Sequence, residues 1–254
     1  MRTASETDKY IASKMKQFKL VDMRELYQSL IDEAESSALG YKEFLVRLLE
    51  AEEGGKASRR EERLKKQACF ESAKTLDDIN YQFNPSMDRA KIEHLGKLGF
   101  IGACENIVII GPPGVGKSMI ATGIGRNACK AGHRVLYANA NDLIDLLHKK
   151  MAEGTLGEAL AQLEKLSLLI VDELSYLKMD KEKESIFFQI VRQRYEKGSL
   201  VITTNLPMGR WDELFTGQVA ATAILDRLVH HCHILTITGD SYRVKGNLYE
   251  ERKK

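Results

Sequence analysis

Residues 111–118 read G-P-P-G-V-G-K-S and follow the apolar run N-I-V-I-I at 106–110. The pattern G-x-x-x-x-G-K-[S/T] is met by Gly111, Gly116, Lys117 and Ser118, and a segment with helical character, K-S-M-I-A-T-G-I-G-R-N-A-C-K, follows. A strand, a glycine-rich loop and a helix in this order predict backbone N–H groups that turn inward on phosphate groups at the positive end of a helix. This context separates a phosphate-binding loop from a chance match.

The loop predicts a bound nucleoside triphosphate with Mg²⁺, and the sequence lacks the N-K-x-D guanine reader expected of a GTPase. We expect Lys117 to neutralise the β- and γ-phosphates and the Ser118 hydroxyl to ligate Mg²⁺. Asp172 is expected to be the second residue that holds Mg²⁺. The expected nucleotide-binding residues are Gly111, Pro112, Pro113, Gly114, Val115, Gly116, Lys117, Ser118, Met119 and Asp172.

Two further apolar runs end in polar residues. L-L-I-V-D-E-L at 168–174 fits a buried strand that delivers Asp172 and Glu173 to its carboxyl end, where open α/β sheets bind ligands. Glu173 is placed to polarise an attacking water, which favours hydrolysis over phosphoryl transfer. In S-L-V-I-T-T-N-L-P at 199–207, the Asn205 amide is placed to orient the same water, although an Asn before Leu-Pro is also a common turn former.

Short β-branched runs alternate with helical segments from about residue 100 onward. We expect strands at 107–110, 134–138, 168–171, 200–204 and 234–238, and helices that begin near Gly116, Asn141, Leu156, Lys181 and Gln218. This alternation predicts an α/β fold with a parallel five-stranded sheet sandwiched by helices.

The N-terminal third lacks this alternation and has a helical pattern instead. Apolar residues at helical spacing predict amphipathic helices over 20–34 and 41–49, the second ending at Gly54-Gly55. The segment 56–74 carries seven Lys or Arg against three Glu. It fits either a solvated helix with i,i+4 ion pairs or a strip that follows a phosphate backbone. The DNA-binding candidates are Arg59, Arg60, Arg63, Lys65, Lys66, Lys149 and Lys150.

Composition limits the remaining possibilities. The 254 residues carry a formal net charge of +2, have no apolar run long enough for a membrane span, and begin with a polar stretch unlike a signal peptide, so we expect a cytoplasmic protein. Four scattered cysteines without a C-x-x-C pair predict neither disulfides nor a four-cysteine zinc site. His230, His231, Cys232 and His233 are consecutive, so their side chains are expected to diverge, and we do not expect a metal there.

The motifs G-P-P-G-V-G-K-S, L-I-V-D-E and T-T-N, in this order, resemble those of the AAA+ ATPases. Several blocks resemble the IstB-like insertion-sequence ATPases, transposition helpers related to bacterial helicase loaders of the DnaC type. These blocks are Y-K-E-F-L-V-R-L-L-E-A-E, R-R-E-E-R-L-K-K-Q-A-C-F, K-T-L-D-D-I-N-Y-Q-F-N-P-S-M-D-R, L-L-I-V-D-E-L-S-Y-L and D-S-Y-R. The resemblance covers most of the chain.

The resemblance implies roles for two arginines. Arg227 in A-I-L-D-R-L-V-H-H matches the arginine finger that one subunit presents to the γ-phosphate bound by its neighbour, and Arg243 in G-D-S-Y-R matches the second sensor, which contacts phosphates in its own subunit. Guanidinium suits both roles because it is always charged and offers a fork of donors. The expected catalytic residues are therefore Glu173, Asn205, Arg227 and Arg243.

The resemblance also implies an organisation and a function. We expect a helical N-terminal domain over 1–70 for partner or DNA interaction, a linker over 71–100 and an AAA+ ATPase domain over 101–254. Within the linker, residues 74–89 read by themselves as an extended, partly apolar connector with a turn at Asn84-Pro85. The hypothesis is an ATPase that assembles with ATP on double-stranded DNA and assists transposition by selecting or remodelling target DNA and recruiting or stimulating a cognate transposase. The alternatives are a replicative helicase loader and a monomeric P-loop small-molecule kinase.

Overall fold

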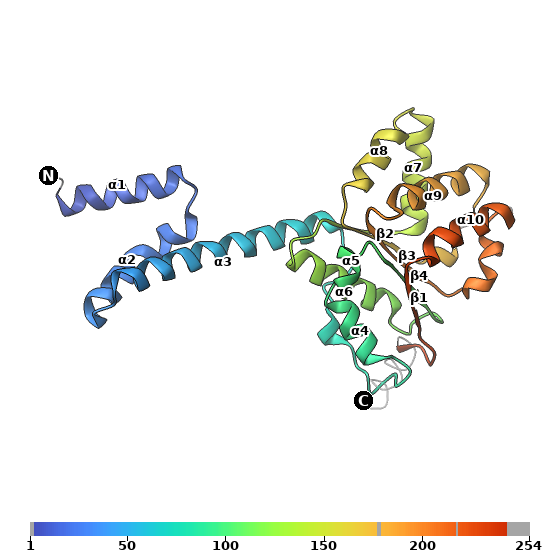
Figure 1. Cartoon of the computed structure of the whole chain (residues 1–254), viewed down its shortest axis with the longest axis horizontal. Helices are drawn as coiled ribbons and strands as arrows, with labels where there is room; N and C mark the ends of the chain where they lie inside the picture. The colour runs from blue at the N-terminus through green and yellow to red at the C-terminus, as the bar shows by residue number, and fades with distance from the viewer. Residues whose placement is uncertain (1–2, 177–178, 217, 243–254) are drawn as a thin grey trace, which may run out of the picture. The chain divides into compact units, whose positions relative to one another are not determined.

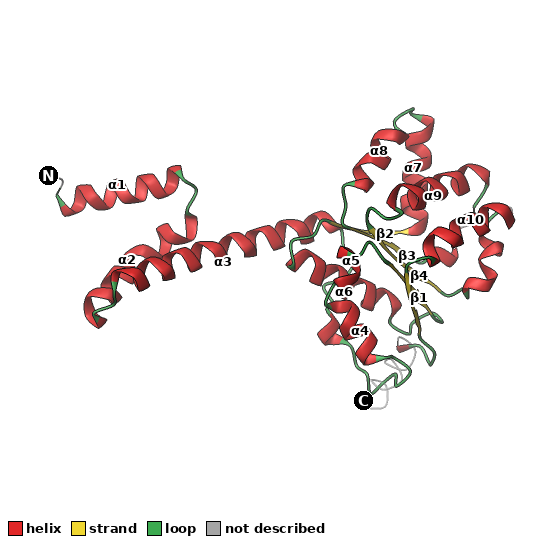
Figure 2. Cartoon of the chain, in the orientation of Figure 1, coloured by secondary structure: helices red, strands yellow, loops and turns green. Residues whose placement is uncertain are grey.

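The computed structural model describes residues 3–176, 179–216 and 218–242. The chain divides into two compact units, Met1–Arg63 and Leu64–Lys254. Figure 1 traces the elements along the chain, and Figure 2 separates the helical unit from the unit that holds the sheet. None of the helices in the described residues combines the length and apolar character that crossing a membrane requires.

The first unit is built from α1 (Ala4–Gln17), α2 (Val21–Ser37) and the first part of α3 (Tyr41–Ala68). Its small core contains Met23 and Leu30 of α2 and Leu48 of α3. Thr3 caps α1 through a capping box with Glu6, which satisfies two of the N–H groups that a helix start leaves unpaired. Apolar residues at helical spacing therefore pack these helices against one another.

The expectation that a helix ends at Gly54-Gly55 is wrong, because α3 continues to Ala68. Gly55 is needed for close packing inside the helix: a Cβ placed there would lie 2.0 Å from the Asp22 carboxyl carbon. The Glu52 side chain, only 4% exposed, accepts hydrogen bonds from the backbone N–H groups of Asp22 and Met23 at 2.9 and 3.2 Å. Glu52 thus caps the start of α2, and the adjacent glycine allows that approach.

The second unit contains a parallel sheet in the order β2-β3-β4-β1-β5. Its strands are β1 (Asn106–Ile110), β2 (Val135–Asn139), β3 (Leu168–Asp172), β4 (Ser199–Thr204) and β5 (Cys232–Thr236). In register, Ile110 pairs with Thr204, and Asn139 pairs with Asp172. The carboxyl ends of β1, β2, β3 and β4 therefore meet at one edge of the sheet, and the predicted parallel α/β sheet is confirmed.

Helices cover both faces of the sheet (Figure 1). Alternate strand residues, such as Val108, Leu169 and Ile202, pack with the helices of one face. Ile107, Ile170 and Val201 pack with the helices of the opposite face. The first face is covered by α7 (Ala140–Ala152), α8 (Leu156–Glu164), α9 (Lys181–Arg194) and α10 (Gln218–Val229), and the second by α4 (Arg89–Gly96), α5 (Gly99–Gly102) and α6 (Lys117–Lys130). The short 3-10 turns are η1 (Leu76–Asp78), η2 (Leu174–Tyr176) and η3 (Met208–Leu214).

The segment 71–100, which the sequence predicts as a linker, contains short helical elements. It holds η1, α4 and the start of α5, and Ile92 and Leu95 of α4 are 0% and 1% exposed in the core beneath the sheet. The burial of α4 makes the segment part of the second unit.

Arg194, at the end of α9, is a charged residue inside this unit. It is 2% exposed and donates to the carbonyl groups of Leu163, Leu166 and Ser199 at 2.7, 3.2 and 2.8 Å. Burial lowers the pKa of Arg194 to about 10, so the guanidinium stays charged at neutral pH. One side chain thus joins the end of α8 and the loop after it to the start of β4.

We expect Arg194→Leu to lower the free energy of unfolding by about 3 kcal/mol or more, because several buried carbonyl groups lose their donor at once. Urea unfolding followed by circular dichroism measures the change. Arg192→Leu, at an exposed position of the same helix, is the matched control. Equal midpoints for the two variants would contradict this role for Arg194.

Candidate nucleotide-binding site

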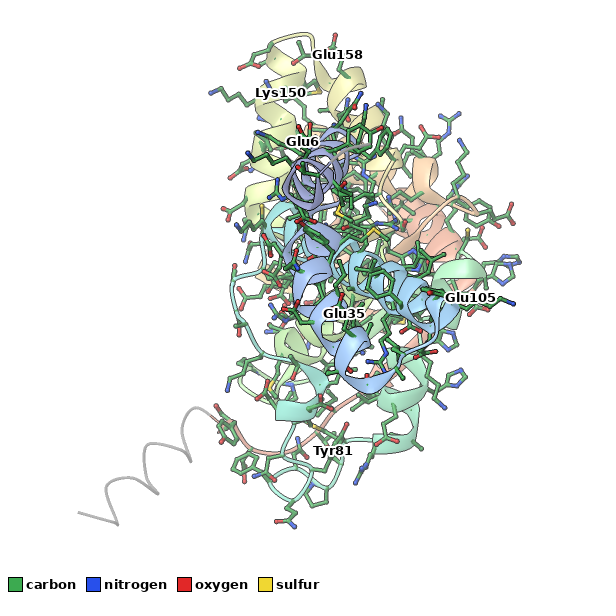
Figure 3. The ribbon with its side chains drawn as sticks, turned by 90° about the vertical axis from the view of Figure 1, so that its left-hand side faces the viewer. Glu6, Glu35, Tyr81, Glu105, Lys150 and Glu158 are labelled. Atoms are coloured by element: carbon green, nitrogen blue, oxygen red, sulfur yellow. The ribbon has the colours of Figure 1, made fainter. Side chains whose placement is uncertain are left out.

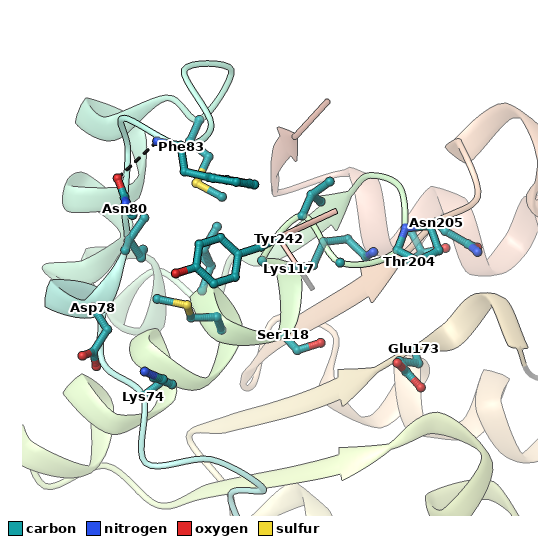
Figure 4. A pocket seen from close by; sticks show the side chains of 18 of the residues that line it. Lys74, Asp78, Asn80, Phe83, Lys117, Ser118, Glu173, Thr204, Asn205 and Tyr242 are labelled. Atoms are coloured by element: carbon teal, nitrogen blue, oxygen red, sulfur yellow. Dashed lines mark hydrogen bonds between the residues drawn. The ribbon is translucent and has the colours of Figure 1, made fainter. Parts of the chain in front are cut away.

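A cavity of about 500 Å³ lies at the carboxyl edge of the sheet. Figure 4 shows Lys117, Ser118, Glu173 and Asn205 around it, with Phe83 and Tyr242 beside them. The loop and first turn of α6 supply one wall through residues 113–120. Residues far apart in the sequence therefore meet at the point where parallel α/β sheets bind ligands.

The loop 111–116 adopts backbone conformations that favour glycine. Gly114 and Gly116 have φ values of +80° and +103°, in the left-handed region. A Cβ on Gly111 would lie 2.4 Å from the Ile237 carbonyl oxygen. The Lys117 ammonium donates to the Pro112 carbonyl at 2.9 Å, so the lysine folds back over its own loop. The loop leads directly into the N-terminus of α6, and residues 113–118 line the cavity.

Asp172 is the buried centre of the site. Its side chain is 3% exposed at the end of β3 and accepts hydrogen bonds from the hydroxyl groups of Ser118, Tyr137 and Thr203. The Ser118 Oγ to Asp172 Oδ1 distance is 3.1 Å. The three donors come from α6, β2 and β4, and each fixes the carboxylate from a different direction. The two predicted Mg²⁺ residues are thus in direct contact.

Tyr137 is held in its neutral form. Burial, followed by its hydrogen bond to Asp172, raises the pKa of the Tyr137 hydroxyl well above its usual range. A phenol that stays protonated remains a donor to the carboxylate at every physiological pH. The Tyr137 ring also packs against Phe70, with ring centroids 6.1 Å apart in an edge-to-face arrangement. Tyr137 therefore orients Asp172 and is itself oriented by aromatic packing.

Glu173 and Asn205 flank the same cavity. Glu173 has a φ of +61°, which turns the chain away from the strand, and its backbone N–H donates to Thr203 Oγ1 at 2.9 Å. Its carboxylate accepts from the Asn139 amide at 3.2 Å. The Asn205 backbone N–H donates to Ser175 Oγ at 3.1 Å. Both predicted water-positioning residues therefore line one cavity beside the loop.

The remaining wall of the cavity comes from residues that precede the first strand or follow the last strand in the sequence. Ile79, Asn80, Phe83 and Met87 line the cavity together with Tyr242. The Phe83 and Tyr242 rings lie 4.7 Å apart, and the Tyr242 backbone N–H donates to the Gly114 carbonyl at 2.9 Å (Figure 4). This apolar and aromatic wall suits the flat face of a base. Arg243, the expected second sensor, lies outside the described residues.

Arg227 lies on α10, away from the residues that line the cavity. Its guanidinium packs over the Phe188 ring of α9, 5.2 Å from the centroid, and donates to the Ala223 carbonyl at 2.8 Å. The structure therefore does not bring Arg227 to the loop of its own chain.

The DNA-binding candidates are distributed over two helices. Arg59 on α3 forms an ion pair with Asp22 at 2.6 Å. Lys150, in the last turn of α7, pairs with Glu153 at 2.8 Å, and Figure 3 shows its side chain on the helical pair that also carries Glu158. Lys149, next to it, is exposed. Arg59 and Lys150 therefore form ion pairs within the chain, and both lie on helix surfaces.

The sequence reasoning missed the residues that hold the predicted ones. Asn139 and Thr203 lie near the carboxyl ends of β2 and β4, the two strands that pair with β3, so the register of a parallel sheet was the signal for them, whereas Tyr137 lies in the middle of β2. Glu71 was missed as well: burial and the charges of Asp172, Glu173 and Asp142 raise the pKa of its carboxyl group. No spacing in the sequence connects that loop with the strand ends.

Comparison with known proteins supports this arrangement. The family model described as IstB-like ATP binding protein matches residues 13–249. The insertion sequence IS21 putative ATP-binding protein of Pseudomonas aeruginosa is 42% identical over 226 residues, which cover 89% of this chain and 84% of that protein. The insertion sequence IS5376 putative ATP-binding protein of Geobacillus stearothermophilus is 37% identical over 232 residues, covering 91% and 92%.

Solved structures are similar in fold. AMPPCP-bound DnaA from Aquifex aeolicus aligns with a TM-score of 0.57 at 18% identity, over 73% of this chain and 57% of that chain. The expected AAA+ P-loop NTPase core with its parallel sheet is thereby confirmed, together with a helical N-terminal region. Since the family model spans nearly the whole sequence and the loop retains its phosphate-binding geometry, the chain belongs to the family of IstB-like ATP-binding proteins.

Proposed function

We propose that this protein is an ATPase that assembles with ATP on double-stranded DNA and assists transposition by preparing target DNA and engaging a transposase. The observation that carries the proposal is the convergence of Lys117, Ser118, Asp172, Glu173 and Asn205 at one edge of the sheet. The relatives described as insertion-sequence ATP-binding proteins support the transposition context.

The residues present fit ATP with Mg²⁺. Mg²⁺ prefers oxygen ligands, and the Ser118 hydroxyl and the Asp172 carboxylate lie 3.1 Å apart at the mouth of the phosphate-binding loop. When bound, Mg²⁺ supplies positive charge that stabilises the charge on the transferred phosphoryl group. Ser118 and Asp172 would hold it, and Lys117 would leave the Pro112 carbonyl to neutralise phosphate oxygens.

Hydrolysis is assigned to Glu173 with Asn205. A carboxylate at the edge of the cavity accepts a proton from water and makes its oxygen a better nucleophile for the γ-phosphorus atom. The Asn139 amide holds Glu173 in the present structure, so the carboxylate has to exchange this donor for the water. Asn205 offers both a donor and an acceptor to fix that water.

Assembly is assigned to Arg227. Within one chain its guanidinium packs on Phe188 instead of lining the cavity, so its contact with a γ-phosphate requires a second subunit. A guanidinium that reaches the γ-phosphate from the neighbouring subunit binds ATP and loses its partner after hydrolysis, so ATP favours the assembled state and turnover favours release. Arg243 is proposed as the phosphate contact from the same subunit.

We expect Lys117→Ala to abolish ATP binding and ATP-dependent assembly, because the phosphates lose their cation. Glu173→Gln should bind ATP and assemble on duplex DNA, but its kcat should fall at least about 100-fold, since the amide cannot accept the proton. Nucleotide binding, ATP turnover and size-exclusion chromatography with duplex DNA measure these effects. Parental turnover in both variants would refute the site assignment.

We expect Tyr137→Phe to raise the Mg²⁺ concentration required for ATP turnover by about 10- to 100-fold, because Asp172 loses the donor that orients it. The ring and its contact with Phe70 are retained, so the variant should fold, with a moderately lower Tm because the buried carboxylate loses one of its three donors. Tyr81→Phe, at a tyrosine that packs on Arg89, is the control. An unchanged Mg²⁺ dependence would show that Tyr137 serves packing alone.

DNA binding is proposed for the basic face of α3. At 100° per residue, Arg59, Arg63 and Lys66 lie on one face of the helix, whereas Lys65 lies on the opposite side. Asp22 pairs with Arg59, so Arg63 and Lys66 are the better variants for a test. The exposed Lys149 and its neighbour Lys150 on α7 are proposed as a second contact.

We expect the double variant Arg63→Gln/Lys66→Gln to bind duplex DNA more weakly and to reduce the slope of log affinity against log salt by about 0.9 per lost phosphate contact. Lys65→Gln is the matched control. Fluorescence anisotropy with labelled duplex and single-stranded DNA measures both slopes. Preference for single strands would favour the helicase-loader alternative, and absence of DNA binding would favour a P-loop kinase acting alone.

A further inference from the structure

The turns that follow α9 and α10 bring three metal-ligating side chains together. Glu196 lies two residues after the end of α9, and His230 and His231 follow α10 directly. One ligand atom from each of Glu196, His230 and His231 lies within 4.8 Å of the other two. The cluster is separate from the nucleotide cavity, because none of its residues lines it. It belongs to no part of the proposed ATP site.

The orientation of the histidines leaves nitrogen atoms available. His230 Nδ1 lies 3.2 Å from the Tyr195 hydroxyl oxygen. The Tyr195 hydroxyl has one proton to donate and can also accept a hydrogen bond. If that proton points to Glu196, the hydroxyl oxygen accepts from His230 Nδ1–H, and the Nε2 lone pair is free. A ligating imidazole in proteins is ordinarily fixed through its other nitrogen in this way.

The electrostatic surroundings favour a cation. The cluster lies at the C-terminal ends of α9 and α10, where the last carbonyl groups carry partial negative charge. Lys197, next to Glu196, is directed to Glu164 at 2.8 Å. The carboxylate of Glu196 therefore adds a full negative charge to two helix ends that already attract cations.

The ligand types identify the class of ion. Two imidazole nitrogens with one carboxylate oxygen are typical of zinc and related divalent ions, whereas Mg²⁺ takes oxygen ligands. The Cys232 thiol does not belong to the cluster. His233 is paired with Glu105 at 2.8 Å. Of the four consecutive residues 230–233, only the first two are therefore directed towards Glu196.

We propose that Glu196, His230 and His231 form a binding site for a divalent ion of the zinc type that joins the ends of α9 and α10. Consecutive histidines were expected to diverge, yet the His230 and His231 ring centroids lie 4.2 Å apart. Tetrahedral zinc needs ligand atoms about 3.4 Å apart, so small side-chain rotations complete the site, with the fourth position open to water.

The bound ion would restrain the pair of helices that presents Arg227. Arg227 lies one turn before His230 on α10 and packs on Phe188 of α9, so both helices contribute to its position. An ion bound between the ends of α9 and α10 would restrain these two helices at a second point, in addition to the packing of Arg227 on Phe188. This consequence rests on the proposed function, whereas the ion site itself does not.

The test titrates the untagged full-length protein, without nucleotide, with Co²⁺ and then displaces it with Zn²⁺. We expect one ion per chain at micromolar affinity, visible d–d bands and no thiolate-to-cobalt charge-transfer band. His230→Ala, His231→Ala and Glu196→Gln should each weaken binding at least about 10-fold. His94→Ala removes an exposed histidine from α4 and should bind like the parent.

Two further readouts complete the test. A hundredfold excess of Zn²⁺ over Kd should raise Tm by about 5 °C or more in the parent and in His94→Ala, but not in His231→Ala. Lys117→Ala should bind Co²⁺ like the parent, which separates this site from the ATP site. Equal Co²⁺ affinity in His231→Ala and His94→Ala, or a thiolate band, would overturn the proposal.

Discussion

The geometry of the nucleotide site depends on the buried carboxylate of Asp172. Three hydroxyl groups, from Ser118, Tyr137 and Thr203, donate to it and connect α6, β2 and β4 to the end of β3. A carboxylate without these donors would be costly at 3% exposure, and the hydroxyls would lack acceptors. The strand order places β2 and β4 on either side of β3, so two of the three donors reach Asp172 as a direct consequence of the sheet topology.

Much of the core could be predicted because its signals are local. The strand and loop around Gly116 carry their own pattern, and the apolar runs before Asp172 and Asn205 indicate strands that end in polar residues. Once a parallel sheet is inferred, its carboxyl edge must collect these ends. The structure places Lys117, Ser118, Asp172, Glu173 and Asn205 at that edge, in agreement with this reasoning, whereas their catalytic roles stay predictions.

The features that escaped prediction depend on tertiary contacts. Gly55 suggested a helix end because its local preference is to terminate helices, but the approach of Asp22 makes glycine necessary inside α3. The contact of Tyr137 with Asp172 and the convergence of His230 with Glu196 each join segments at least 30 residues apart, which no periodicity records. Arg227 was identified only by resemblance. Its role remains a proposal, because the proposed contact joins Arg227 of one subunit to the nucleotide of another, and the structure describes a single chain.

The aromatic wall of the cavity bears on where the chain can be divided. Ile79, Phe83 and Met87 precede the first strand, whereas Tyr242 follows the last. A fragment that begins at residue 101 would keep the loop 111–116, Glu173 and Asn205 but would lose Ile79, Phe83 and Met87 from the cavity wall. A fragment that keeps the whole cavity therefore extends well upstream of the sheet, and the glycine-rich loop and the aromatic wall come from separate parts of the sequence.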